Sequence, residues 1–277
     1  MLCDTCFRHC DISEGKLGFC GARSVKNGTV VAANYGKVTS LALDPIEKKP
    51  LRRFFPGSKI MSVGSYGCNL NCPFCQNSEI SWSEEALRFG TEADTLTPSE
   101  LRDMAVSAKA YGNIGVAFTY NEPLVGWEYV RDAAKLIKEA GLKTVLVTNG
   151  CASCRVCDEL NGLIDAMNID LKGFTEDYYS KVLKGDLSMV KAFIEKAVSY
   201  AHVELTTLIV PGENDSLEEM RDISTWIAGL DPEIPLHISR FFPQFRMTDR
   251  AATDVARIYR LADVAREKLK FVYTGNC

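Results

Sequence analysis

Short apolar segments alternate with longer amphipathic stretches along the chain from Lys59 onward. This alternation is typical of repeated βαβ units, because two parallel strands must be joined by a crossover that is usually a helix. We expect strands at 59–66, 114–120, 143–148, 165–171, 203–210 and 235–241, with a short final strand at 271–274. Six βα units are too few to close an eight-stranded barrel. The sequence therefore predicts an α/β fold, a partial (β/α)6 TIM-type barrel.

Capping signals agree with this division. Thr97-Pro98-Ser99-Glu100 and Ser216-Leu217-Glu218-Glu219 each predict the start of a helix, because a Ser or Thr side chain and a Glu three residues later satisfy the first free backbone N–H groups. Apolar residues at helical spacing predict a last helix over about 249–268.

The chain before the barrel has a different character. Residues 24–43 carry apolar positions on both sides of Asn27-Gly28, a dipeptide that favours a two-residue hairpin turn, and residues 44–57 read as an ordered connecting loop. We therefore expect a small N-terminal cysteine-rich β appendage with its connecting loop over 1–57, and the barrel over 58–277.

Composition narrows the class of protein. The 277 residues are 46% apolar and contain neither a basic leader before an apolar run nor eighteen consecutive apolar residues, so we expect a soluble, cytoplasmic protein without a membrane span. A formal charge of −4 argues against nonspecific nucleic-acid binding. Eleven cysteines at short spacings without an export signal favour metal or cluster ligation over disulfides.

Three cysteines directly follow the first predicted barrel strand. Cys68, Cys72 and Cys75 are separated by three and then two residues, and no Cys or His lies between Asn77 and Cys151. A closed zinc site needs a fourth ligand nearby, and a [4Fe–4S] cluster normally has four cysteines. Three thiolates would leave one iron open to a substrate or cosubstrate. The alternative is three packed thiols in a loop.

A second group of four soft ligands lies at the N-terminus: Cys3, Cys6, Cys10 and Cys20, with His9 as a spare candidate. Such a group is able to hold zinc or an auxiliary cluster, and the alternative is a set of free thiols. Cys151, Cys154 and Cys157 are spaced by three, which suits one helix face and either a cluster or packed thiols; Cys277 stands alone at the terminus.

Three predicted strands carry polar residues on one face, by the two-residue period of a strand. These residues are Asn168, Asp170 and Lys172, then Glu204 and Thr206, then His237 and Ser239. Parallel strands covered by helices are normally apolar on both faces. The pattern predicts a lumen lined for a polar ligand, and the alternative is a closed polar core whose groups satisfy one another.

Further polar residues stand where strands end, and barrel enzymes keep their sites at that edge. A carboxylate at Glu122 would suit an ammonium group, Lys172 or Arg240 would neutralise a carboxylate, and Asp170 would accept from ribose hydroxyls. Motifs for nucleotide phosphate loops, dinucleotide binding, serine hydrolysis and zinc proteolysis are absent.

The Cys-x3-Cys-x2-Cys spacing, with Phe74 before the last cysteine, resembles the signature of the radical S-adenosylmethionine enzymes. Thr148-Asn149-Gly150 and Asp170-Leu171-Lys172 are similar to the activating enzymes of pyruvate formate-lyase. The narrower resemblance, to the radical enzymes of the AmmeMemoRadiSam system, covers essentially the whole chain and rests on the N-terminal cysteines, residues 44–51, 55–57, 67–69, 75–77 and 119–123, and Tyr273-Thr274-Gly275-Asn276.

This resemblance implies a [4Fe–4S] cluster on Cys68, Cys72 and Cys75 that cleaves S-adenosylmethionine reductively to a 5′-deoxyadenosyl radical, which takes hydrogen from a substrate that the resemblance does not name. A low-potential donor such as flavodoxin or ferredoxin, and partner proteins of the AmmeMemoRadiSam system, are implied with it. The superfamily's Gly-Gly-Glu is replaced by Tyr120-Asn121-Glu122, so only Glu122 is carried over directly.

We expect cofactor contacts from Phe74, Asn77, Tyr120, Asn121, Glu122, Thr148, Asn149, Asp170, Lys172, His237 and Arg240. Two alternatives stay open. One is an activase that acts on a glycyl-radical enzyme. The other is a metal or iron–sulfur redox sensor or scaffold without turnover.

Overall fold

The computed structural model describes residues 1–92 and 94–277. The strands are β1 (Arg23–Lys26), β2 (Thr29–Ala32), β3 (Ser40–Pro45), β4 (Lys59–Gly64), β5 (Asn113–Phe118), β6 (Lys143–Thr148), β7 (Ala166–Asp170), β8 (His202–Ile209), β9 (Leu236–Arg240) and β10 (Val272–Gly275). The α-helices are α1 (Ser78–Ser81), α2 (Glu84–Glu92), α3 (Pro98–Ser107), α4 (Trp127–Glu139), α5 (Cys154–Leu160), α6 (Leu187–Ala197), α7 (Leu217–Leu230) and α8 (Val255–Arg266). Short turns of helix are η1 (Ile46–Lys48), η2 (Ala108–Tyr111), η3 (Pro123–Gly126) and η4 (Tyr178–Leu183).

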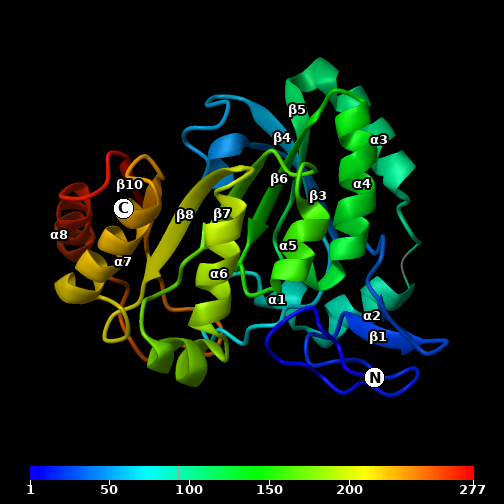
Figure 1. Ribbon diagram of the computed structural model, residues 1–277, viewed down its shortest axis with the longest axis horizontal. Helices are drawn as coiled ribbons and strands as arrows, with labels where there is room; N and C mark the ends of the chain where they lie inside the picture. Colours follow the sequence, from blue (N-terminus) through cyan, green and yellow to red (C-terminus); the bar gives the residue numbers. More distant parts are fainter. Residues whose placement is uncertain (93) are drawn as a thin grey trace.

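One eight-stranded sheet organises the chain, in the order β10-β9-β8-β7-β6-β5-β4-β3. Neighbouring strands from β4 to β10 are parallel, and β3 pairs antiparallel with β4 at the edge. Helices α4, α5 and α6 cover the outer face of the middle strands, with α7 and α8 beside β8 and β10 (Figure 1). The sheet does not close between β3 and β10, so the partial barrel predicted from the sequence is confirmed.

The predicted barrel strands are each found within two residues of their expected bounds. The capping box at Thr97 is confirmed, with Thr97 and Glu100 bonding each other's backbone N–H groups. At Ser216 only half of the box forms, because the Glu219 carboxylate accepts from the Phe174 N–H (2.6 Å) instead. The last helix begins at Val255 rather than 249, because the Asp254 side chain caps it by accepting from the Ala256 N–H.

The N-terminal segment is only partly a separate appendage. β1 and β2 form the hairpin predicted around Asn27-Gly28. β3 lies inside the predicted appendage 1–57 and pairs with β4 in the main sheet. An edge strand left bare would expose unpaired backbone groups, and β3 covers β4. The boundary at 57/58 otherwise stays a prediction.

At one end of the barrel interior, the polar side chains form hydrogen bonds with one another and with the connecting loop. The Glu204 carboxylate accepts from the backbone N–H groups of Arg52 (3.0 Å) and Arg53 (2.7 Å). The His202 and His237 Nε2 atoms lie 2.9 and 2.6 Å from its two oxygens.

Asn168 extends the network around Glu204. Its Nδ2 donates to the Pro50 carbonyl (2.9 Å), and its Oδ1 accepts from Thr206. At this end the polar groups satisfy one another, as in the alternative of a closed polar core. The connecting loop closes this end, and Asp170 and Lys172 are left at the other.

None of the helices within residues 1–92 and 94–277 combines the length and the apolar character that crossing a membrane requires.

We predict that Glu204→Ala destabilises the fold by about 3–5 kcal/mol, because two imidazoles and two backbone N–H groups lose a buried acceptor. Burial alone raises the pKa of Glu204, but the bonds from His202, His237 and the loop outweigh it and lower that pKa to about 2. A carboxyl with a lowered pKa contributes stability above its unfolded pKa and loses it as pH falls toward its folded pKa.

Urea unfolding of the wild type should therefore show stability lost between about pH 5 and pH 2, and Glu204→Ala should lose less over that window. Glu233→Ala is the matched control, since Glu233 forms an exposed ion pair with Lys270, and it should cost at most about 1 kcal/mol. Equal unfolding free energies for the two variants would contradict the buried role.

Candidate active site

The loop that carries Cys68, Cys72 and Cys75, called the cysteine loop below, follows β4 at the carboxyl edge of the sheet. It crosses closely over the N-terminal segment. Gly67 adopts a φ of +89°, and a Cβ at this position would lie 2.6 Å from the Cys20 carbonyl oxygen. Only glycine tolerates both the left-handed backbone and this approach. The Cys68 N–H donates to the same carbonyl (3.2 Å), so the first cysteine is held by the crossing.

The three thiols are shielded from solvent. Cys72 is buried, and Cys68 and Cys75 are half-buried. Burial raises the pKa of all three thiols, to about 11 for Cys72. The nearby backbone N–H groups of Leu70 and Asn77 partly offset the rise at Cys68 and Cys75. A bound metal would remove these protons, because coordination deprotonates a thiol outright.

The donor set fits an iron–sulfur cluster better than a single ion. Within the part of the chain that the structure describes, no group of three or more His, Cys, Asp or Glu side chains is arranged to hold one metal ion. In a cluster each cysteine binds a different iron, so the three sulfurs need not converge on one point. Their charges nevertheless act on one another, as a shared site requires.

Asn121 fixes the backbone that leads into the cysteine loop. Its Oδ1 accepts from the Ser65 N–H (3.0 Å), and its Nδ2 donates to the carbonyls of Tyr66 (3.0 Å) and Gly67 (3.1 Å). The side chain is buried and its amide is occupied by these bonds. Asn121 thus ties the end of β5 to the cysteine loop as a positioning residue.

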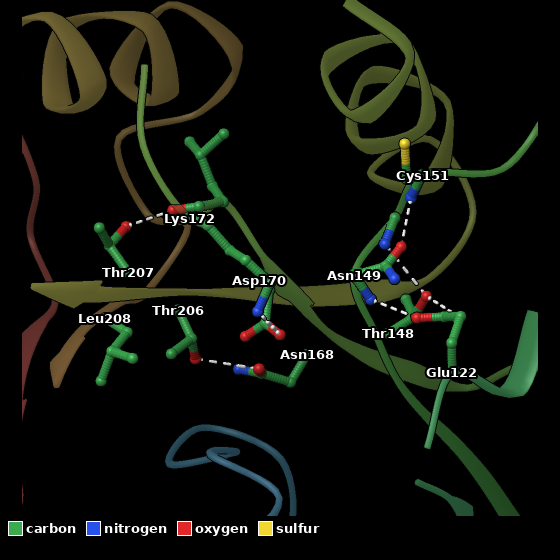
Figure 2. A network of polar contacts seen from close by, with 12 residues as sticks. Glu122, Thr148, Asn149, Cys151, Asn168, Asp170, Lys172, Thr206, Thr207 and Leu208 are labelled. Carbon is green, nitrogen blue, oxygen red and sulfur yellow. Dashed lines mark hydrogen bonds and ion pairs between the residues drawn. The ribbon is translucent and has the colours of Figure 1, made fainter. Parts of the chain in front are cut away.

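Glu122 is buried beside the cysteine loop and bonds to the end of β6. Its carboxylate accepts from the Thr148 hydroxyl (2.6 Å) and from the N–H group of Asn149 (2.7 Å) (Figure 2). It also accepts from the N–H group of Leu124 (3.0 Å). Burial raises the pKa of Glu122 to about 7 in spite of these three bonds. A carboxylate has about four lone-pair sites, so one remains for a cation, which would hold the group ionised.

Asn149 joins this carboxylate to the first cysteine. Its Nδ2 donates to the Asn69 Oδ1 (2.9 Å) and lies 3.8 Å from the Cys68 sulfur. Its Oδ1 accepts from the Cys151 N–H (2.8 Å). The Asn69 amide in turn donates to the Cys151 carbonyl (2.7 Å). The sequence did not predict a role for the Asn69 side chain, although this residue stands inside the cysteine motif.

The Asp170–Lys172 ion pair forms the other side of the site. Lys172 Nζ lies 2.7 Å from the Asp170 carboxylate, and Figure 2 shows the pair apart from Glu122 and Asn149. Burial lowers the pKa of Lys172, but Asp170 and Cys72 outweigh that effect and raise it. The positive charge of Lys172 in turn offsets part of the rise that burial causes in the pKa of Cys72 and Cys75. The ammonium group therefore lies within electrostatic reach of two of the three thiols.

Tyr178 contributes a buried polar group without a hydrogen-bond partner among residues 1–92 and 94–277. It lies at the start of η4, its ring packs over Gly173, and none of these residues bonds its hydroxyl. Burial first, and then the negative charge of Cys72, raise its pKa. An orphaned buried hydroxyl near Cys72 and Lys172 is what a polar ligand would satisfy. The sequence offers one indication of this residue, the Tyr178-Tyr179 pair shortly after Lys172.

Two of the expected cofactor residues on the cysteine-loop side are engaged elsewhere. Phe74 is buried in the core and meets the Phe241 ring edge-on at 6.3 Å. The Tyr120 hydroxyl donates to Asp44 (2.7 Å), which also pairs with the buried Lys49 (2.8 Å). Their side chains lie in the core and on the connecting loop, so the expected contacts are not supported.

The remaining expected residues also have partners. Asn77 donates to the Tyr120 carbonyl (2.7 Å) and so links the third cysteine to β5. His237 bonds Glu204 in the closed end of the barrel, which is a correction to its expected place. Arg240 donates to the Thr253 carbonyl (2.7 Å) and stacks over Phe242.

The later cysteines do not gather on one helix face. Cys151 precedes α5 and is buried, Cys154 is exposed, and Cys157 lies 3.2 Å from the Tyr200 hydroxyl. Cys277 is exposed, with its thiol 3.6 Å from the Gly275 carbonyl. A cluster on the first three is not supported, and Cys157 is a packed thiol.

Comparisons with known proteins bear on this site. Residues 62–224 match the family model of the radical SAM superfamily. The chain is 39% identical to the uncharacterized protein MJ0808 of Methanocaldococcus jannaschii over 278 residues, which covers 99% of this chain and 80% of that protein. It is 29% identical to a pyruvate formate-lyase-activating enzyme of Clostridium pasteurianum, over 60% of this chain and 67% of that one.

Among solved structures, Streptococcus suis SuiB bound to S-adenosylmethionine aligns with a TM-score of 0.59 at 14% identity, over 76% of this chain and 48% of SuiB. A domain of a pyruvate-formate lyase-activating enzyme from Bacteroides vulgatus aligns with a TM-score of 0.51 at 16% identity, over 58% of this chain and 99% of that domain. These two alignments establish a shared fold.

Members of the superfamily are enzymes that use a [4Fe–4S] cluster and S-adenosylmethionine, and they need a reductant. The alternative of a sensor without turnover is therefore not retained. With a matching domain over more than half of its length and three thiols at the carboxyl edge of a partial barrel, this chain belongs to the radical SAM superfamily.

Proposed function

We propose that this enzyme cleaves S-adenosylmethionine reductively and uses the resulting 5′-deoxyadenosyl radical to take hydrogen from a substrate. The observation that carries the proposal is the meeting of three shielded thiols, the Glu122 carboxylate and the Asp170–Lys172 pair at one edge of the sheet. The cluster supplies the electron for this cleavage when it is bound. The chain's own residues bind the cosubstrate, orient it and exclude water.

Glu122 suits the ammonium group of S-adenosylmethionine. Its carboxylate is buried, retains a free acceptor site, and lies within electrostatic range of Cys68. A cation there would offset the burial that now raises its pKa. Asn149 holds the Glu122 carboxylate through its backbone N–H and Cys68 through its side chain, so it aligns the amino acid moiety with the first thiol.

Lys172 suits the carboxylate of the same moiety, and Asp170 suits the ribose hydroxyls. Opening their ion pair is feasible, because the Asp170 side chain is 31% exposed and water can replace the pair there. The Tyr178 hydroxyl would donate to the same ligand.

A narrower assignment is to the radical enzymes of the AmmeMemoRadiSam system, acting in the cytoplasm with partner proteins of that system and a flavodoxin or ferredoxin as electron donor. Support comes from the motifs along the whole sequence, from the N-terminal cysteines to Tyr273-Thr274-Gly275-Asn276. The 39% identical relative spans 99% of the chain, whereas the activating enzyme from Clostridium spans 60%.

An activase for a glycyl-radical enzyme is the second candidate, and the similarity to two pyruvate formate-lyase-activating enzymes favours it. Deuterium transfer separates the two. Transfer into 5′-deoxyadenosine from a glycine-labelled protein would support the activase. Transfer from a labelled small molecule would contradict it.

We predict that Cys68→Ala, Cys72→Ala and Cys75→Ala each lose the cluster and all cleavage, because no other thiol in the loop can replace them. Iron content, visible absorption and 5′-deoxyadenosine yield would be measured after anaerobic reconstitution. Cys154→Ala is the matched control, since that thiol is exposed, and should behave as the wild type. A single loop variant with a wild-type yield would refute the ligand assignment.

We predict that Glu122→Gln and Lys172→Met each weaken S-adenosylmethionine binding by roughly ten- to a hundredfold, because a charge-assisted hydrogen bond contributes about 1.5–3 kcal/mol. Binding would be measured anaerobically, with the change it causes in the electron paramagnetic resonance signal of the reduced cluster.

Lys181→Met is the control for Lys172, because Lys181 forms an exposed ion pair with Asp177. Iron content should be unchanged in all three variants. Unchanged affinity and a wild-type spectral change in both test variants would assign Glu122 and Lys172 to the polar core instead.

A further inference from the structure

The four N-terminal cysteines form a shielded group rather than scattered surface thiols. Cys3, Cys6 and Cys20 are buried and Cys10 is half-buried. The Cys3 N–H donates to the Cys10 carbonyl (2.9 Å), which folds the segment back on itself. Cys6 lies within electrostatic range of Cys3 and Cys10, and Cys20 within range of Cys6 and Cys3. One compact set of four soft ligands results.

Burial raises the pKa of the Cys6 and Cys20 thiols, and nearby backbone N–H groups partly offset the rise: that of Arg8 at Cys6, and those of Ala22 and Arg23 at Cys20. The N–H group two residues after the cysteine acts in the same way in the active-site loop, where Leu70 follows Cys68 and Asn77 follows Cys75. Coordination to a metal would remove the remaining protons, because it deprotonates a thiol outright.

The group is in contact with the active-site loop. The Asn69 side chain lies near Cys6 and partly offsets the rise that burial causes in the pKa of that thiol. The Asn69 Oδ1 accepts from Asn149 Nδ2 (2.9 Å), which lies 3.8 Å from the Cys68 sulfur. The Cys68 N–H in turn donates to the Cys20 carbonyl (3.2 Å). Two separate paths therefore join the N-terminal cysteines to the first active-site thiol.

We propose that Cys3, Cys6, Cys10 and Cys20 bind a second, auxiliary iron–sulfur cluster beside the active one. Zinc draws four ligands onto one ion, whereas four thiolates of a [4Fe–4S] cluster each hold a different iron. No group of three or more His, Cys, Asp or Glu side chains within the described residues is arranged for one ion, and this applies equally to Cys68, Cys72 and Cys75.

The second cluster differs from the first in its ligand count. Four cysteines occupy every iron of a [4Fe–4S] cluster, so the auxiliary site has no open position for S-adenosylmethionine. Its charge lies beside Asn69 and Cys68, so its presence shifts the reduction potential of the active cluster. The site does not depend on the proposed reaction, because its test counts iron and records spectra without turnover.

Anaerobically reconstituted full-length protein tests the proposal by iron, sulfide and zinc analysis together with electron paramagnetic resonance of the reduced state. The wild type should contain about eight irons per chain. The Cys68→Ala/Cys72→Ala/Cys75→Ala variant should keep about four, with a signal that S-adenosylmethionine does not change. The Cys6→Ala/Cys20→Ala variant should keep about four, with a signal that S-adenosylmethionine does change and a midpoint potential shifted from that of the wild type.

The Cys154→Ala/Cys277→Ala variant removes two exposed thiols outside both groups and should match the wild type. The variant that lacks the three loop cysteines leaves the N-terminal group intact, so it tests the site even if Cys6→Ala/Cys20→Ala fails to fold. About four irons in the wild type, with or without one zinc, would overturn the proposal. So would complete loss of iron from the loop variant.

Discussion

The buried carboxylate of Glu204 is the interaction on which the architecture depends. An open barrel of parallel strands has a polar interior with two ends, and one end must be closed if a reactive ligand is to be kept from water. Glu204 closes it by accepting from two histidines and from two backbone N–H groups of the connecting loop. The loop is thereby fastened across β8 and β9.

Glu122 is equally buried, yet its environment has the opposite effect. The donors around Glu204 lower its pKa to about 2, whereas the three neutral donors around Glu122 leave its pKa raised to about 7. The two carboxylates differ in their partners. Glu204 has two imidazoles and two backbone N–H groups, whereas Glu122 accepts from one hydroxyl and two backbone N–H groups and lies near Cys68 and Asp170. An arrangement with one satisfied and one unsatisfied carboxylate gives the barrel a closed end and a binding end.

The N-terminal segment is part of the active-site architecture. Gly67 crosses the Cys20 carbonyl at a distance that only glycine allows, and Arg8 donates to the Asn69 carbonyl (2.7 Å). The segment lies at the edge of the sheet beside α1, where the cysteine loop is found (Figure 1). The environment of Cys68 is therefore built from residues far apart in the sequence, and changes in the N-terminal cysteines should reach it.

Periodicity and cysteine spacing alone determined the βα order, the strands of the sheet, the cysteine loop and its place at a strand end. These are local properties, because a strand's two-residue period and a capping box such as that at Thr97 are written in neighbouring residues. Glu122, Asn149, Asp170 and Lys172 were also identifiable, since strand ends in a parallel sheet meet at one edge.

The tertiary structure alone decided which polar residues face the site and which satisfy one another. His237 and Asp170 lie on polar faces that the sequence pattern treats alike, yet one bonds Glu204 and the other pairs with Lys172 beside the thiols. The same holds for β3, for Tyr120 and for the hydroxyl of Tyr178. The Tyr120 hydroxyl, for example, donates to Asp44, which lies 76 residues earlier in the chain. Hydrogen bonds between such distant segments form only after the chain has packed.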